Sequence, residues 1–144
     1  PLNQKTVTEE LGVSDEIASF VLPMGMTINM DGTAIMQTIA AIFVASCGGY
    51  EVTFGSVIVI ALLALVASIG TPAAPGAGAV ILFTILSGMG YINEGALMAY
   101  SLILAINRPI EMLVTSLNVV GDSTTALYVA KSEGMLNEEI FNQD

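Results

Sequence analysis

Polar residues interrupt the apolar sequence at a few defined places, and the first interruption divides a long apolar stretch in two. Apolar residues run from position 17 to 28, stop at the tetrapeptide NMDG (29–32), and resume up to position 47. Each half is too short to cross a bilayer, which takes about 20 apolar residues, but the two together are long enough. We therefore predict one transmembrane helix with an unwound centre over residues 17–47, after a polar lead-in over residues 1–16.

The second interruption is the sequence SIGTPAAPGAG (68–78), which lies between two apolar arms of a length typical of re-entrant segments. Its prolines cannot lie inside a regular helix, and its glycines adopt backbone conformations that other residues avoid. Irregular backbone at membrane depth survives only where protein or a wet cavity surrounds it. We predict that residues 55–90 form a re-entrant helical hairpin. The alternative is a loop between helices that is exposed to water.

The last apolar stretch is predicted as a transmembrane helix over residues 95–130, followed by an acidic tail over residues 131–144. Polar residues recur along it at intervals of four, four, three and four, and so share one face of an α-helix: Asn107, Glu111, Thr115, Asn118 and Asp122. An aspartate at the bilayer centre costs about 2.5–3.5 kcal/mol. This face must therefore meet a protein interior, a water-filled cavity or a cation. A polar packing seam is the alternative, but it does not explain two carboxylates.

These elements predict an all-α membrane protein with a broken transmembrane helix, a re-entrant helical hairpin and a final polar-striped transmembrane helix. A re-entrant hairpin makes no net crossing, so Lys5 and Lys131 fall on the same side of the membrane. Basic residues favour the cytoplasmic side. We therefore expect a multi-pass protein of the cell membrane with both chain ends in the cytoplasm.

Composition narrows the class of function. Only 11% of the 144 residues are charged, against about 25% in soluble domains, so lipid is expected around the chain. Three basic residues are too few for a nucleic-acid-binding surface. The single cysteine, Cys47, excludes a disulfide within one chain, and the lack of histidine argues against a zinc or haem site. No nucleophile stands with a partner base, so we do not expect an enzyme.

Oxygen-bearing side chains near the first break indicate a cation site. Asn29 and Asp31 lie in the unwound centre, and Asn118 and Asp122 lie on the polar stripe. Unwinding frees carbonyl oxygens, and hard cations prefer carbonyl and carboxylate ligands. With no thiolate or imidazole nearby, Na⁺ or a proton suits these ligands better than a transition metal does. The alternative is a capped kink that binds nothing.

The second break has the features of a substrate site. The arm after Gly78 begins with free N–H groups, which attract an anion such as a carboxylate, and the arm before the break ends with free carbonyl oxygens, which suit a cation. Broken helices arranged in this way mark the binding site of secondary transporters. We therefore expect the break to act as a gate over a binding site.

Three motifs in this order resemble one family: NMDGT (29–33), SIGTPAAPGAG (68–78) and NVVGD (118–122). Over residues 15–133 the sequence resembles the C-terminal part of the transport domain of the sodium-coupled glutamate/aspartate transporters, the dicarboxylate/amino acid:cation symporters. The resemblance implies a homotrimer that works by an elevator motion, with the second hairpin as its gate. The scaffold helices and first hairpin of that family have no counterpart in the 144 residues. We therefore expect a fragment, or a truncated product that needs partner segments.

The resemblance also implies binding roles for individual residues, with sodium ions as the coupled ions. One sodium site would be lined by Gly25, Asn29, Asn118 and Asp122. A second would use mostly backbone oxygens of Thr27, Met30, Ser68, Ile69 and Thr71. Asn29 and Asp31 would contribute to a third. The small-molecule substrate, an amino acid or dicarboxylate, would be held by Thr33, Ala74, Pro75, Gly78, Glu111, Thr115 and Asn118.

Three positions depart from the family pattern. Members that carry acidic amino acids usually have an arginine just before the threonine that matches Thr115, and here that position is Val114. The aspartate that pairs with this arginine is replaced by Asn107, and Glu111 stands where the family has an aspartate for the substrate's amino group. Arg108 lies six positions before Val114, about 120° away around a helix, and does not simply replace the arginine. We therefore expect the substrate to be a neutral or otherwise non-acidic amino acid.

Two other functions remain open from the sequence. The polar stripe would also suit the water-filled wall of a passive channel subunit, and the whole chain would also suit an inactive remnant that only packs in the membrane. Saturable uptake driven by a sodium gradient separates a symporter from a channel. Sodium-dependent binding of a substrate separates a symporter from a remnant.

Overall fold

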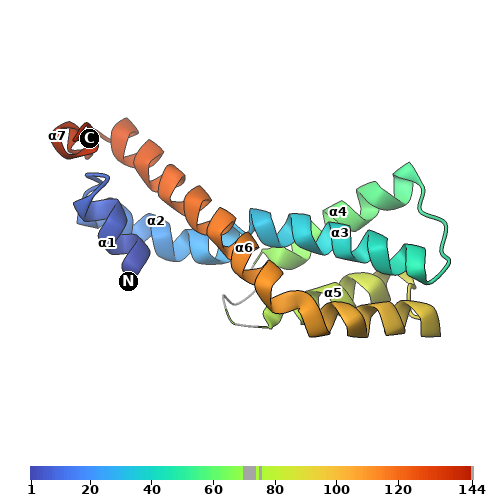
Figure 1. Ribbon diagram of the computed structural model, residues 1–144. Helices are drawn as coiled ribbons and strands as arrows, with labels where there is room; N and C mark the ends of the chain where they lie inside the picture. The colour runs from blue at the N-terminus through green and yellow to red at the C-terminus, as the bar shows by residue number, and fades with distance from the viewer. Residues whose placement is uncertain (70–73, 75, 144) are drawn as a thin grey trace.

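The computed structural model describes residues 1–69, 74 and 76–143, and these residues form α-helices joined by short connections (Figure 1). The helices are α1 (Leu2–Glu9), α2 (Asp15–Ile28), α3 (Asp31–Cys47), α4 (Phe54–Ser68), α5 (Ala77–Met89), α6 (Glu94–Ser132) and α7 (Glu138–Phe141). Within the described part, extended pairing is limited to one isolated antiparallel bridge. The segment Asp15–Cys47, with 33 residues, and α6, with 39, are long and apolar enough to cross a membrane.

The helices α2 and α3 follow one another in line, and α6 crosses over the place where they meet (Figure 1). Beyond this crossing, α4 and α5 pack against each other and against α3. Both chain ends, with α1 and α7, lie at the opposite end of the molecule (Figure 1). The crossing therefore lies between a bundle of α3, α4, α5 and the first half of α6 and a smaller group formed by α1, α2, α7 and the second half of α6.

The break between α2 and α3 is shorter than the sequence suggested. Only Asn29 (φ −92°, ψ 78°) and Met30 (φ −113°, ψ 43°) leave the helical conformation. Asp31 already belongs to the first turn of α3, where a carboxylate is favoured by the helix dipole. The N–H of Asn29 still donates to Gly25 O at 2.8 Å, so α2 is hydrogen-bonded up to the break.

The two short apolar helices run beside α3 and turn back. Their 15 and 13 residues correspond to about 20 Å of helix each, which is less than the roughly 30 Å of a bilayer core. α4 begins with a capping box in which Thr53 and Ser56 exchange hydrogen bonds at 3.2 and 2.9 Å. Buried side chains join both helices to α3 and α6, among them Ile60, Ala64, Leu82, Ile85, Val44 and Ala99.

The chain ends, predicted as polar flanking segments, are part of the fold. Val7 of α1 is fully buried in a cluster with Val13, Ala18, Ala126 and Ala130. Val13 and Leu136 form the isolated bridge: Ser14 N donates to Met135 O at 3.2 Å, and Asn137 N donates to Gly12 O at 2.8 Å. The lead-in and tail are therefore held together at one end.

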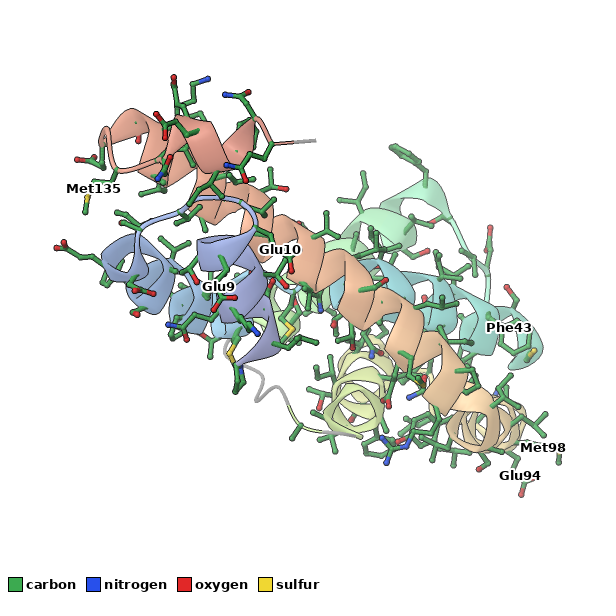
Figure 2. The ribbon with its side chains drawn as sticks, turned by 60° about the vertical axis from the view of Figure 1, so that its left-hand side comes forward. Glu9, Glu10, Phe43, Glu94, Met98 and Met135 are labelled. Atoms are coloured by element: carbon green, nitrogen blue, oxygen red, sulfur yellow. The ribbon has the colours of Figure 1, made fainter. Side chains whose placement is uncertain are left out.

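The course of α6 along the whole molecule is clear from the labelled side chains of Figure 2. Glu94 and Met98, at the start of α6, lie on the right with Phe43, whereas Met135, just after its end, lies at the far left. Large apolar side chains are exposed along this path, including Met112, Leu113 and Val120. Exposed apolar side chains along a helix that is long enough to cross a membrane fit a surface that lipid or protein covers.

Candidate functional site

A pocket of about 610 Å³ lies where α6 crosses the break between α2 and α3. Three parts of the chain that are distant in sequence line it. The break and its flanks contribute Met26, Asn29, Met30, Thr33, Met36 and Gln37. The hairpin contributes Ala74, Ala77 and Gly78, and α6 contributes Arg108, Glu111, Met112, Val114, Thr115, Asn118, Val119 and Asp122.

Asn118 fixes the start of α3 against α6. The first N–H groups of a helix have no acceptor within that helix, and here Gly32 N donates to Asn118 Oδ1 at 2.8 Å. The amide nitrogen of Asn118 in turn donates to Thr33 Oγ1 at 3.2 Å and lies 3.4 Å from Met30 Sδ. One side chain on the polar stripe therefore supplies a partner to the backbone that the break leaves unpaired.

Asp122 lies one turn further along α6 and is 5% exposed. Asn29 Nδ2 donates to Asp122 Oδ1 at 2.8 Å and to Asn118 O at 3.3 Å. A Cβ atom at Gly25 would overlap the Asp122 carboxylate, so the backbone of α2 approaches this group as closely as glycine allows. In the part of the chain that the structure describes, no basic side chain pairs with Asp122.

Glu111 lies in the other half of the pocket and has two partners on its own helix. Asn107 Nδ2 donates to Glu111 Oε1 at 2.6 Å, and Arg108 Nη1 lies 3.4 Å from Glu111 Oε2. The hydroxyl of Thr115 donates to Glu111 O at 2.7 Å. Arg108 and Val114 both border the pocket, although they lie on different sides of α6.

The first turn of α5 lies at one side of the pocket and is held there by Gln37, a residue that the sequence analysis did not identify. Gln37 is fully buried, and its Nε2 donates to Gly78 O at 2.8 Å. The hydroxyl of Tyr100 donates to Ala79 O at 3.0 Å. A glutamine inside the apolar sequence TAIMQTIAAIF is a signal that could have identified it, because polar residues within membrane helices are rarely without a role.

The structure brings together only part of the predicted site. Nine of the predicted residues border the pocket: Asn29, Met30, Thr33, Ala74, Gly78, Glu111, Thr115, Asn118 and Asp122. Gly25 lies just behind Asp122. Asp31, Thr27, Ser68 and Ile69 are not among the lining residues. The hydroxyls of Thr27 and Ser68 donate to Met24 O and Leu65 O at 2.9 Å in their own helices, and Thr71 and Pro75 lie outside the described residues.

The arrangement offers oxygen ligands rather than a cluster of charged metal ligands. Among the described residues there is no group of three or more Asp, Glu, Cys or His side chains that could hold a metal ion. The Asp122 region instead combines one carboxylate with the side-chain amide of Asn29 and the backbone carbonyl of Asn118, and carboxylate and carbonyl oxygens are the ligand type that hard cations prefer. The Glu111 region combines a carboxylate with hydrogen-bonding groups and apolar walls from Met36, Met112 and Val114.

Comparison with known proteins identifies similar sequences. The profile of the sodium:dicarboxylate symporter family matches residues 1–132. An excitatory amino acid transporter of Caenorhabditis elegans is 40% identical over 126 residues, which are 88% of this chain and 24% of the relative. Human excitatory amino acid transporters 1 and 2 are each 38% identical, over 100% and 92% of this chain and 25% and 23% of the relatives.

These matches confirm the family resemblance that the three motifs predicted. The chain spans about a quarter of the length of the curated relatives it matches. The matched family and relatives bear the names of transporters, in agreement with the expectation that the chain is not an enzyme.

The close contact between α3 and α6 gives a test of the site's geometry. We expect Gly32→Ala to destabilise the full-length protein by about 1–3 kcal/mol, a typical cost of overpacking. The added Cβ would lie 2.5 Å from Val114 O and 3.0 Å from Val114 Cβ. Thermal unfolding in detergent, followed by circular dichroism, measures the effect.

Gly55→Ala is the matched control for this substitution. Gly55 is also the second residue of its helix, and a Cβ there meets nothing closer than Thr53 Oγ1 at 3.8 Å. Equal melting temperatures for the two variants would show that α3 and α6 are not in contact at Gly32.

Proposed function

The chain belongs to the sodium:dicarboxylate symporter family, and we propose that it forms the C-terminal part of the transport domain of a secondary active symporter. The symporter moves an amino acid or dicarboxylate across the cell membrane together with sodium. The observation that carries this proposal is the pocket at the crossing, where a break in one apolar helix meets the polar stripe of another. A break of this kind at membrane depth is tolerated only where protein surrounds it or where it lines a water-filled cavity.

In this proposal the Asp122 region is a sodium site. The carboxylate is buried, its described partner is an amide, and Gly25 brings backbone within reach of it. A cation supplies the charge that this environment lacks, which offsets the cost of burying the carboxylate. The ligands of this site are Gly25, Asn29, Asn118 and Asp122.

Two further sodium sites are proposed from the family pattern. The second uses mainly backbone oxygens of Thr27, Met30, Ser68, Ile69 and Thr71. The third uses Asn29 and Asp31. The ends of α2 and α4 at Ile28 and Ser68 support the second site, because the last carbonyl groups of a helix have no partner within it.

The substrate lies in the Glu111 half of the pocket. Its amino group is received by Glu111 and its carboxylate by Asn118 and by the hairpin backbone at Ala74, Pro75 and Gly78, with Thr33 and Thr115 as neighbours. The apolar Val114 occupies the position of the family's arginine, so a second carboxylate on the substrate has no cation at that place. A neutral amino acid therefore fits the pocket better than an acidic one.

The hairpin of α4 and α5 acts as the gate over this site, and the domain moves by an elevator motion within a homotrimer. Ala77 and Gly78 of α5 border the pocket, and the hydrogen bond from Gln37 to Gly78 O holds the first turn of α5 in place. Both chain ends lie at one end of the molecule (Figure 1), which supports a common, cytoplasmic side for Lys5 and Lys131. A passive channel subunit and an inactive packing remnant are the competing functions.

The sodium site is tested with Asp122→Asn. The substitution keeps the size of the side chain but removes its charge, so we expect sodium affinity to fall by at least about tenfold, or about 1.4 kcal/mol. Substrate affinity should fall with it, because the two binding events are linked. Isothermal titration of the full-length protein with sodium, and with substrate at fixed sodium, measures both effects. Asp15→Asn, at the exposed start of α2, is the control, and unchanged sodium affinity in Asp122→Asn would rule out this site.

The gate is tested with Gly78→Ala. The added Cβ would lie 3.0 Å from Gln37 Nε2 and 3.3 Å from Glu111 Oε1, so it would disturb both the hydrogen bond that holds the first turn of α5 and the carboxylate of Glu111. We expect substrate affinity to fall by several-fold while sodium affinity without substrate changes little. Gly88→Ala in the same helix, whose Cβ meets only Leu63 Cδ1 at 3.8 Å, should behave as wild type. Equal substrate affinities for the two variants would show that the hairpin only connects its neighbouring helices and does not act as a gate.

The substrate class is tested by competition. Proteoliposomes that contain the full-length protein are assayed for sodium-driven uptake of labelled L-serine and L-aspartate, each against a panel of unlabelled amino acids. We expect neutral amino acids to be taken up and to compete, and L-aspartate to compete poorly, since Val114 offers its side-chain carboxylate no partner. Uptake that L-aspartate blocks and neutral amino acids leave unaffected would contradict the proposed substrate. Flux that does not saturate would favour the channel, and no sodium-dependent binding would favour the remnant.

A further inference from the structure

The carboxylate of Glu111 is already occupied on both oxygens by groups of its own helix. Asn107 Nδ2 donates to Oε1 at 2.6 Å, and Arg108 Nη1 contacts Oε2 at 3.4 Å. The Glu111 side chain is 18% exposed, and it borders the pocket. Each oxygen can accept a further hydrogen bond, but the side chain is only 18% exposed, and a positively charged ligand that approaches Oε2 from the pocket meets the like charge of Arg108.

The two groups differ in how firmly they are held. Asn107 is buried at 5% exposure, and its hydrogen bond is short. The Arg108 side chain is 67% exposed, and its contact with Glu111 is longer and involves one nitrogen. Exposed ion pairs of this kind are weak, because solvent screens them and a long side chain loses conformational freedom in forming them. Arg108 is therefore the group that gives way.

Arg108 is also the one basic side chain that borders the pocket in the described part of the chain. Lys5 pairs with Glu9 on α1 at 3.7 Å. An unpaired carboxylate in an apolar environment is costly, so Arg108 neutralises Glu111 while the pocket is empty. The arginine and the ammonium of a ligand then have the same function and compete for the same oxygen.

We propose that Arg108 is an internal counter-ion that occupies Glu111 in the empty pocket and is displaced by the ammonium group of the substrate. The inference rests on the proposed function, in which Glu111 receives that ammonium. It assigns Arg108 a positioning role that acts through Glu111: the arginine lowers the affinity for amines and neutralises the Glu111 carboxylate while no ligand is bound. It also predicts selectivity, because a ligand without an ammonium group does not replace the arginine.

The opposite role makes the opposite prediction. If Arg108 bound a carboxylate of the substrate directly, removing its charge would weaken binding. If Arg108 only bordered the pocket, its removal would leave affinity unchanged. The sign of the change in affinity therefore distinguishes the three cases.

The experiment measures amino acid binding to the full-length protein at saturating sodium by calorimetry. The probes are L-alanine, L-serine and L-aspartate, together with L-lactate, in which a hydroxyl group replaces the ammonium of L-alanine. We expect Arg108→Gln to bind the amino acids on the order of three- to fivefold more tightly than wild type, the size of an exposed ion pair. Arg108→Lys should keep nearly wild-type affinity, and L-lactate should gain nothing from either substitution.

Two further variants control for indirect effects. Lys5→Gln removes a basic residue outside the pocket and should leave all affinities unchanged. In a Glu111→Gln background, Arg108→Gln should bring no gain, because the pair no longer exists and the effects of two coupled residues are not additive. Unchanged or weaker amino acid binding in Arg108→Gln, or an equal gain for L-lactate, overturns the inference. If the wild-type protein binds none of the amino acids, the proposed function fails and this inference fails with it.

Discussion

The contact between the polar stripe of α6 and the break between α2 and α3 is the interaction on which the rest of the structure depends. A helix that stops and restarts within an apolar segment leaves N–H and carbonyl groups without partners, and lipid supplies none. Here Asn118 accepts from Gly32 N, and Asn29, freed from the helix, donates to Asp122. The break thus gives the polar side chains of Asn118 and Asp122 partners inside the protein, and these side chains in turn stabilise the break.

This contact also determines where the hairpin lies. Beyond the crossing, α3 and the first half of α6 stay in contact as far as their ends, where Asn93 Nδ2 donates to Gly48 O at 2.8 Å, and α4 and α5 pack against α3 on this side of the crossing (Figure 1). Gln37 from α3 and Tyr100 from α6 each donate to a carbonyl group in the first turn of α5, at Gly78 and Ala79. The start of α5 is thus fastened to both helices that form the crossing, so a change in the angle between them would be transmitted to the hairpin.

The sequence predicts the stripe well because helical periodicity is a local property. The spacing of Asn118 and Asp122 places them on one face of α6, and the NMDG tetrapeptide identifies the break within two residues. Other features depend on packing between distant segments and have no local signature. The burial of Val7 in the chain-end cluster, the bridge between Val13 and Leu136, and the bond from Gln37 to the hairpin belong to this class.

Arg108 shows the same limit within one helix. Its angular distance from Val114 correctly separates the two positions around α6, but an arginine side chain reaches across neighbouring turns, and Arg108 lies three residues before Glu111. The position of a residue on a helical wheel thus indicates whether its backbone faces the pocket. The length of its side chain decides whether its charged group can still reach the pocket.

The distribution of charge divides the pocket into two unequal halves. Glu111 has a cation on its own helix, whereas Asp122 has an amide and no basic partner in the described part of the chain. On electrostatic grounds a cation from solution would therefore stabilise the Asp122 carboxylate more than the Glu111 carboxylate, which already has a cationic partner. Asn118 belongs to both halves. Its side chain contacts the start of α3, and its carbonyl accepts from the same Asn29 amide that donates to Asp122. A cation that rearranged the contacts of Asp122 would therefore also move Asn118. In the proposed function, this shared residue is the physical route by which binding of a sodium ion at one end of the stripe would change the affinity for substrate at the other.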